Sequence, residues 1–342
     1  MEGESLAGLS PEELGEALAL GEPYRARQVY RWIARGASGW EEMTDLPAAE
    51  RSRLAGLRPR VDSSSPAARL EDPDGSIKLQ VRLADGAAVE CVLLEDLEGR
   101  RTACLSCQVG CPMGCAFCKT GSLGYLRDLS AGEIVEQFRF LRAAAGRGAI
   151  SNVVFMGMGE PMLNLGAVRK AIAILSDPRG IGLSLRKITI STSGVVPGIL
   201  DLAEHGPKVR LAVSLTSADD GLRGELMPVN SRWDLAALKD ALARYQAATG
   251  ERITLEAALM GGRNSSPADA EALVRWASPL KVQVNLIPWN KVPGLPFSEP
   301  SRAELEAFAA VLERAGMTAS RRMRRGRGVM GACGQLGDTL RA

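Results

Sequence analysis

Three cysteines lie in one short stretch, Cys111-Pro-Met-Gly-Cys115-Ala-Phe-Cys118. Their thiolates are soft ligands of the kind that iron–sulfur clusters take. A cubane [4Fe–4S] cluster takes one thiolate for each iron, so three thiolates leave one iron without a protein ligand. An open iron could chelate a small molecule and pass an electron to it, which a fully ligated cluster cannot do. The spacing therefore predicts redox chemistry at an iron–sulfur cluster.

Other metal sites use different cysteine patterns. A structural zinc site takes four ligands, usually as two separated pairs. Here Cys104 and Cys107 join the three cysteines above, which is denser than a zinc finger or ribbon. A ferredoxin would read Cys-x2-Cys-x2-Cys-x3-Cys-Pro, and this chain does not. The spacing favours an open cluster over zinc, and a zinc-stabilised module remains the alternative.

The composition is that of a globular protein, with 342 residues, 46% hydrophobic and 24% charged. We expect no transmembrane helix, since no run of about eighteen apolar residues occurs. We also expect no secretory signal, because the start lacks a basic region followed by an apolar one. Seven cysteines, five of them clustered, suit a reducing compartment. We therefore expect a cytoplasmic protein without membrane contact, acting as a monomer.

A net charge of +2 argues against a uniformly basic surface for nucleic acid. Five arginines nevertheless gather near the C-terminus: Arg321, Arg322, Arg324, Arg325 and Arg327. Guanidinium groups match phosphate geometry, so this cluster is a candidate contact with an RNA backbone. A solvated loop is the alternative, and the sequence leaves both open.

Three regions precede the C-terminal tail. Residues 1–62 are expected to form a small helical domain, with a capping box at Ser10 and Glu13 and further helices at 24–34 and 47–57. Residues 63–98 are expected to form a linker and a β-meander, because Asp74-Gly75 and Asp85-Gly86 are hairpin signals. Residues 99–322 alternate between strands and helices. Residues 323–342 form a glycine-rich tail.

The alternating region predicts an α/β fold. Strands are expected at 102–107, 152–156, 187–191, 209–215, 253–257 and 282–287, and helices after Ser130, Ser266 and Ser301. Six such units suit a partial (β/α)6 TIM-like barrel, and a flat doubly wound sheet is the competing layout. In both, ligands lie at the carboxyl ends of the strands. Polar residues fall there on several strands: Gly159, Glu160, Ser191, Ser214, Thr216 and Asn285.

Several motifs together resemble the RlmN/Cfr family of radical S-adenosylmethionine (SAM) RNA adenosine methyltransferases. They are the Cys-x3-Cys-x2-Cys loop and the stretches 104–111, 152–161, 191–197, 285–290 and 332–336. The N-terminal stretches 24–32 and 43–47 are similar to the accessory domain of RlmN. The resemblance covers residues 5–340 and implies a radical SAM core between the helical domain and a catalytic tail.

The resemblance implies a role for each matching residue. Cys111, Cys115 and Cys118 would hold the [4Fe–4S] cluster, and Cys333 would become S-methylated with Cys104 as its partner thiol. Glu90 would be the proton acceptor, although its match needs a one-residue insertion. SAM would contact Gly159, Glu160, Ser191, Ser214, Leu215, Thr216 and Asn285. Two positions depart from the family: Thr216 replaces a usual histidine, and Cys107 a usual serine.

The implied reaction is methylation of adenosine C2, in 23S rRNA near the peptidyl transferase centre and at position 37 of tRNAs. It would use two SAM molecules per turnover, an S-methylcysteine, a transient disulfide and an electron donor such as flavodoxin or ferredoxin. Trp289, Asn290 and Lys291 are candidate contacts with the RNA. The alternatives are C8 methylation, as in Cfr, and a zinc-stabilised RNA-binding module without catalysis.

Overall fold

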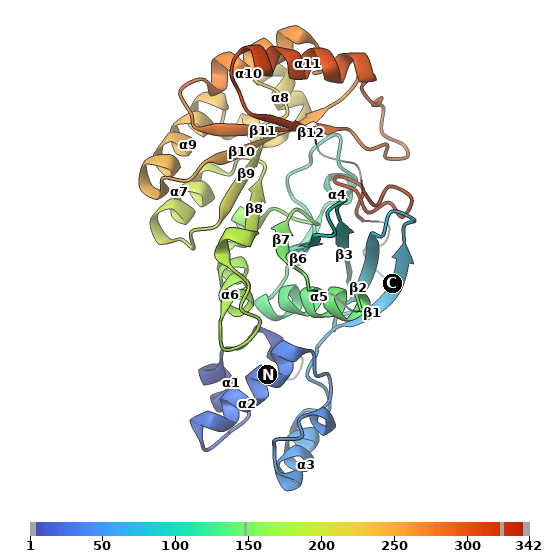
Figure 1. The fold of residues 1–342 in the computed structure, drawn as a ribbon, viewed down its shortest axis with the longest axis vertical. Coiled ribbons are helices and arrows are strands. Elements are labelled where there is room, and N and C mark those ends of the chain that lie inside the picture. The colour runs from blue at the N-terminus through green and yellow to red at the C-terminus, as the bar shows by residue number, and fades with distance from the viewer. Residues whose placement is uncertain (1–4, 147–148, 322–324, 338–342) are drawn as a thin grey trace.

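The computed structural model describes residues 5–146, 149–321 and 325–337. At the N-terminal end a small group of helices stands apart from the sheet (Figure 1). Ser10 and Glu13 form the expected capping box at the start of α1, in which Ser10 N–H donates to Glu13 Oε2 at 2.8 Å. The helices are η1 (Leu6–Gly8), α1 (Pro11–Ala17), α2 (Pro23–Arg35), η2 (Trp40–Glu42) and α3 (Ala48–Leu57).

One continuous sheet organises the rest of the described chain. Its strand order is β1-β2-β3-β4-β7-β8-β9-β10-β11-β12. β1, β2 and β3 pair antiparallel as a meander, with Gly75 and Gly86 in its turns at positive φ, and β3 also pairs antiparallel with β4, the first strand of the parallel part. The strands are β1 (Ser65–Glu71), β2 (Ile77–Arg82), β3 (Ala88–Glu95), β4 (Arg101–Cys104), β7 (Asn152–Phe155), β8 (Ile188–Thr192), β9 (Arg210–Ser214), β10 (Ile253–Leu259), β11 (Val282–Pro288) and β12 (Ala319–Arg321).

Strand order decides between the two layouts expected from the sequence. From β4 to β12 all strands are parallel, and each lies beside its neighbour in chain order. In a doubly wound sheet the order in which successive strands are added reverses at a switch point, so that later strands lie on the other side of the first one. Here each parallel strand is added on the same side. The α/β fold is therefore the partial barrel, with the meander joined to its first strand. The six expected strands are confirmed, and β12 is an additional short one.

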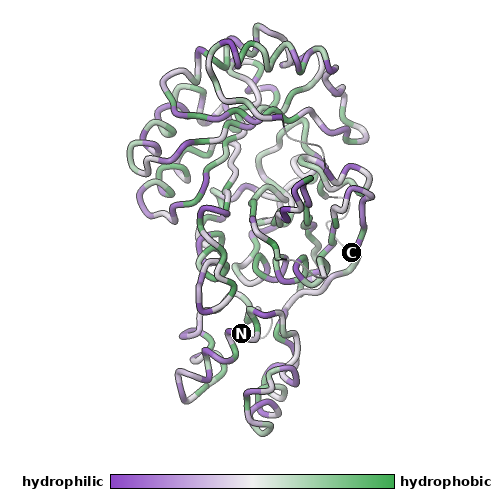
Figure 2. The backbone as a smooth tube through the Cα atoms, in the orientation of Figure 1, coloured by the Kyte–Doolittle hydropathy of each residue, from purple (hydrophilic) through white to green (hydrophobic). Residues whose placement is uncertain are grey.

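Helices cover the outside of the parallel strands (Figure 1). The helices of this part of the chain are α5 (Ala131–Ala144), η3 (Pro161–Leu163), α6 (Leu165–Ser176), η4 (Leu185–Lys187), α7 (Val196–His205), α8 (Asp220–Leu226), η5 (Pro228–Ser231), α9 (Leu235–Thr249), α10 (Pro267–Ala277) and α11 (Arg302–Arg314). Hydrophilic and hydrophobic residues alternate along these outer helices (Figure 2). Capping boxes at Ser130, Ser266 and Ser301 start α5, α10 and α11 as expected. None of the described helices is long and apolar enough to cross a membrane.

The cysteine loop is closed at its base by a second, two-stranded sheet. This sheet pairs β5 (Gln108–Gly110) with β6 (Tyr125–Asp128), and α4 (Lys119–Ser122) lies between them. Cys111 N–H donates to Gly124 O at 2.8 Å, which holds the two ends of the loop together. The loop is thus fixed against the first parallel strand at the carboxyl edge of the barrel.

The C-terminal arginines divide between described and undescribed parts of the chain. Arg322 and Arg324 lie outside the described residues. Arg321 is exposed at the end of β12, Arg327 pairs with Glu299, and Arg325 donates to the carbonyl oxygen of Asp74. Contact of this cluster with RNA stays a prediction.

Candidate active site

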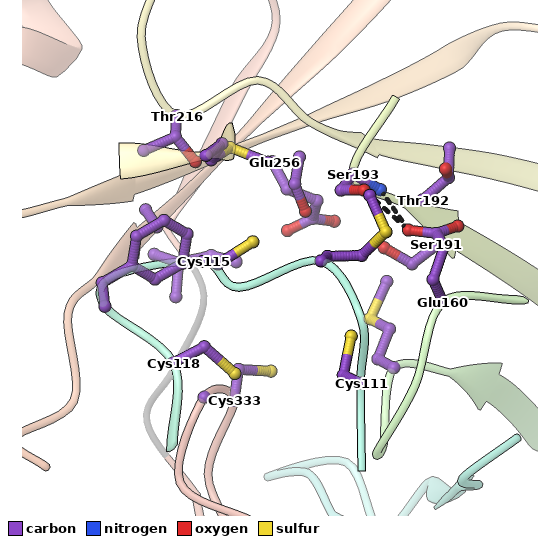
Figure 3. A pocket seen from close by; sticks show the side chains of 18 of the residues that line it. Cys111, Cys115, Cys118, Glu160, Ser191, Thr192, Ser193, Thr216, Glu256 and Cys333 are labelled. Atoms are coloured by element: carbon purple, nitrogen blue, oxygen red, sulfur yellow. Dashed lines mark hydrogen bonds between the residues drawn. The ribbon is translucent and has the colours of Figure 1, made fainter. Parts of the chain in front are cut away.

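Three cysteine thiols from one loop face the same cavity, the cysteine cavity. Cys111, Cys115 and Cys118 all line it, and Figure 3 shows the three side chains arranged around it. Burial raises the pKa of Cys111 to about 12 and also raises the pKa values of Cys115 and Cys118. Without a metal, all three are neutral thiols at neutral pH. Binding of iron must therefore displace protons from them.

The spacing of these thiols separates the two metal hypotheses. Within the described ranges, no three His, Cys, Asp or Glu side chains are close enough together to hold one metal ion. A single zinc would need its ligands gathered around one point. A cubane spreads its thiolates over different irons, so three thiols around a shared cavity suit it. Among the described residues, the side chains of this loop are not gathered as a zinc-stabilised module would require.

Polar groups from successive strand ends form the wall opposite the cysteines. Gly159 and Glu160 follow β7, Ser191 is near the end of β8, and Ser214 and Thr216 end β9. Two expected ligands are not on this wall. Leu215 is fully buried in the hydrophobic core. Asn285 lies deeper in the barrel, where its side chain donates to Glu256 at 2.9 Å.

Both carboxylate oxygens of Glu160 accept hydrogen bonds, Oε1 from Met162 N–H and Oε2 from Ser193. Its side chain accepts from Ser193 N–H and Oγ, both at 2.8 Å. Burial raises the pKa of Glu160, and these hydrogen bonds oppose that shift. Gly159 has φ +102°, and a Cβ there would lie 2.6 Å from the Cβ of Gln108. Glycine is therefore needed at this position, and Gln108 accepts from Glu160 N–H at 2.8 Å.

Several residues of the cavity carried no recognisable signal in the sequence or were given another role. Arg223 lies behind the cavity wall rather than on it: it is fully buried and bridges two strand ends, donating to Ser193 O at 2.7 Å and to Leu215 O at 3.2 Å. Glu256 lines the cavity from β10. Trp289 and Asn290 line this cavity, and their contact with RNA stays a prediction, as does that of Lys291. Trp289 donates to Phe117 O at 3.0 Å and so supports the cysteine loop.

Two residues that line the cavity, Thr216 and Asn290, each have a buried polar atom without a partner. Thr216 Oγ1 and Asn290 Oδ1 find no hydrogen-bond partner among the described residues. Thr216 also has φ +61°, which is rare for a β-branched residue and typical of functional sites. Leaving such atoms unsatisfied costs about 1–3 kcal/mol each. A polar small molecule such as SAM, bound beside the cluster site, would supply these atoms with partners after a small shift of the two side chains.

We expect Thr216→Val to separate stability from binding. Valine keeps the shape and removes the unpartnered hydroxyl, so the protein without ligand should gain about 1–3 kcal/mol in unfolding free energy. Affinity for SAM should fall about tenfold. Chemical denaturation and calorimetric SAM titration of cluster-loaded protein measure the two effects. Thr189→Val on β8, outside the cavity, is the control, and unchanged SAM affinity in Thr216→Val would contradict the assignment.

A second cavity adjoins the first and brings the other two predicted cysteines together. Cys104, at the end of β4, and Cys333, in the tail, both line it. Cys333 also lines the cysteine cavity, as do Met156, Ile287 and Asn290. Beside the cluster loop, Lys119 N–H donates to Gly334 O at 2.8 Å. Cys333 thus stands between the cluster ligands and Cys104.

Glu90 lies near this assembly but lines neither cavity. Cys104 is opposite Val92 in the β3–β4 pairing, so Glu90 is on the same face of the sheet as Cys104. Glu90 is almost fully buried, pairs with Lys78 at 3.1 Å, and accepts from Gly337 N–H at 2.7 Å.

A partial barrel with three loop thiols and a polar wall at its carboxyl edge defines a radical SAM enzyme. A model of the radical SAM superfamily matches residues 105–277. A solved structure, a radical SAM methyltransferase from Sphaerobacter thermophilus, superimposes with a TM-score of 0.93 at 41% identity, covering 97% of this chain and 99% of the other.

Two relatives show to which family of radical SAM enzymes the chain belongs. The dual-specificity RNA methyltransferase RlmN of Anaeromyxobacter dehalogenans is 43% identical over 97% of this chain and 91% of its own length. A Treponema pallidum protein named "Probable dual-specificity RNA methyltransferase RlmN" is 51% identical over 98% of both chains. The chain belongs to the RlmN family of radical SAM RNA methyltransferases, whose chemistry requires a [4Fe–4S] cluster and SAM.

Proposed function

We propose that this chain methylates C2 of adenosine, both in 23S rRNA near the peptidyl transferase centre and at position 37 of tRNAs. The name dual-specificity RNA methyltransferase, carried by relatives across nearly the whole chain, supports two RNA substrates. The observation that carries the proposed mechanism is the place of Cys333. It lines the cavity of the cluster thiols and the cavity that contains Cys104.

Adenine C2 explains why a cysteine carrier is needed. This carbon is not nucleophilic, so it cannot attack the methyl group of SAM directly. In the proposed sequence the Cys333 thiolate takes a methyl group from one SAM, because sulfur is a good nucleophile. The cluster and a second SAM, when bound, would supply the radical that activates this methyl group for bonding to the base. Cys333 then holds RNA and protein together through one carbon.

Release requires a second thiol and a base. Before release, the base adduct must lose its C2 proton and one electron, which the oxidised cluster would accept. The Cys104 thiolate then attacks the sulfur of Cys333: an S–S bond forms, the bond between that sulfur and the carbon breaks, and the freed carbon takes up a proton to become the methyl group of the adenosine. A thiol reductant must reduce this transient disulfide before the next turnover. Glu90 is the proposed acceptor of the C2 proton. In the structure its Oε1 lies 3.1 Å from Lys78 Nζ and its Oε2 accepts from Gly337 N–H at 2.7 Å, so each oxygen has a partner. We propose a cytoplasmic monomer, with flavodoxin or ferredoxin as the electron donor.

The target adenosine must leave its stack to reach the second cavity, as in other enzymes that modify bases. Nucleoside mass spectrometry of rRNA and tRNA from a deletion strain tests the proposal. We expect 2-methyladenosine to disappear from both RNAs and to return with the wild-type gene but not with Cys111→Ala. Unchanged 2-methyladenosine, or loss of 8-methyladenosine in its place, would contradict C2 methylation.

A further inference from the structure

The tail segment 325–337, which carries Cys333, is held from two sides. On the barrel side, Asn290 Nδ2 donates to Cys333 O at 3.1 Å and Thr120 Oγ1 donates to Leu336 O at 2.7 Å. These bonds explain why the tail lies beside the cluster loop. On the other side the tail lies against the meander, near β2 and β3 (Figure 1).

Two aspartates of the β1–β2 turn make the outer contacts. Gly328 N–H donates to Asp72 Oδ2 at 2.6 Å, and Gly326 N–H donates to Asp74 Oδ2 at 2.8 Å. The other oxygen of each carboxylate serves the turn itself: Asp72 Oδ1 accepts from Asp74 N–H at 3.0 Å, and Asp74 Oδ1 accepts from Ser76 N–H at 2.9 Å. In each of these two carboxylates, one oxygen therefore accepts from the turn and the other accepts from the tail.

The tail is shaped to accept these two carboxylates. Gly326 has φ +70°, a conformation that favours glycine. A Cβ on Gly328 would lie 2.8 Å from Asp72 Oδ2, too close for any side chain without a shift. Glycine at 328 therefore permits the backbone to approach the carboxylate.

A buried ion pair adds a second contact from the meander. Lys78 and Glu90 are each almost fully buried and 3.1 Å apart. Lys78 Nζ reaches Met330 O at 3.5 Å, and Glu90 Oε2 accepts from Gly337 N–H, so the pair binds the tail on both sides of Cys333. Burying two charges is expensive and gives little net stability. Its contacts with the tail give this pair a positional role.

We infer that Asp72 and Asp74 are positioning residues for the methyl-carrying cysteine, and that the meander serves as the template on which the tail is docked. The inference rests on the proposed function of Cys333 as methyl carrier. Reacting atoms displaced by about 1 Å can lose about a hundredfold in rate. The β1–β2 turn, which lines neither cavity, thus helps to set the position of the Cys333 sulfur relative to SAM and Cys104.

The test uses Asp72→Asn/Asp74→Asn in the full chain, loaded with its cluster. Asparagine can keep the turn by accepting with its single amide oxygen, and it then presents an NH2 group to the tail N–H. Asp85→Asn, at the β2–β3 turn, is the matched control, because Asp85 likewise caps its own turn through Ala87 N–H. Gly328→Ala tests the same contact from the tail side.

Two readouts at Cys333 are measured by peptide mass spectrometry: its methylation by SAM and its alkylation by iodoacetamide. In the double variant and in Gly328→Ala we expect methylation to slow ten- to hundredfold, since charge-assisted bonds are lost. Alkylation should become faster as the tail undocks, while iron content and SAM affinity match the wild type. Opposite changes of the two rates distinguish positioning from a general loss of structure.

The possible outcomes separate this inference from the function on which it rests. If wild-type Cys333 is never methylated, the proposed function fails, and alkylation still reports whether the turn docks the tail. If the wild type is methylated and the double variant behaves like Asp85→Asn, the positioning role is overturned. Slower methylation without faster alkylation would also overturn it.

Discussion

Replacing Cys333 by alanine is expected to reduce methyl transfer to RNA to the level of an enzyme-free control. The carrier thiol is then absent, and adenine C2 cannot take the methyl group from SAM directly. Iron content and SAM binding should stay at wild-type values, because the cluster ligands are three other cysteines. Transfer from SAM with an isotope-labelled methyl group measures the loss.

Cys104→Ala is expected to fail at a different step of the same reaction. Cys333 can still take up the methyl group and bond to the base, but no thiol is left to break the link. RNA should therefore remain covalently attached to the protein in a denaturing gel. A Cys104→Ala/Cys333→Ala variant should give no adduct. Cys91→Ala is the matched control, since Cys91 is a buried cysteine that lines neither cavity. An adduct in the double variant, or free release by Cys104→Ala, would contradict these roles.

Cys115→Ala is expected to lose the cluster. Two thiols cannot retain a cubane that already lacks its fourth protein ligand. Iron and sulfide content should fall close to zero, the brown colour should disappear, and SAM cleavage should stop. Cys107→Ala is the control: Cys107 is buried and lines neither cavity, so the cluster should be retained. Equal iron loss in both variants would show that the cluster depends on more than the three loop thiols.

The regular part of the fold follows from local sequence. The strand expected at 253–257 is present and extends to Leu259, and the capping box at Ser130 starts α5 as expected. Helical spacing predicts one buried face for α5, but tertiary packing also buries polar residues of this helix, among them Glu136 and Gln137. The short strand β12, Ala319–Arg321, has no such pattern and forms because β11 offers it an open edge. The choice of a barrel over a doubly wound sheet required the strand order, which periodicity does not contain.

The site could be predicted where one loop supplies it, and less well where tertiary packing does. The cluster cysteines share a motif, and Cys104 and Cys333 were linked only through the family resemblance. Asn285 was expected at the carboxyl end of its strand, but β11 continues to Pro288, and Asn290, two residues beyond the strand, lines the cavity. Contact of Asn285 with SAM, which the family resemblance implies, stays a prediction. No local signal connects Asp72 with Gly328, because their contact spans most of the chain.

The central claim is that three thiols hold a cluster whose open iron binds SAM. Anaerobic reconstitution, followed by chemical reduction with SAM, tests it most directly. The account predicts about four iron and four sulfide per chain and formation of 5′-deoxyadenosine. A protein that takes up no iron, or whose reduced cluster releases no 5′-deoxyadenosine from SAM, would contradict it.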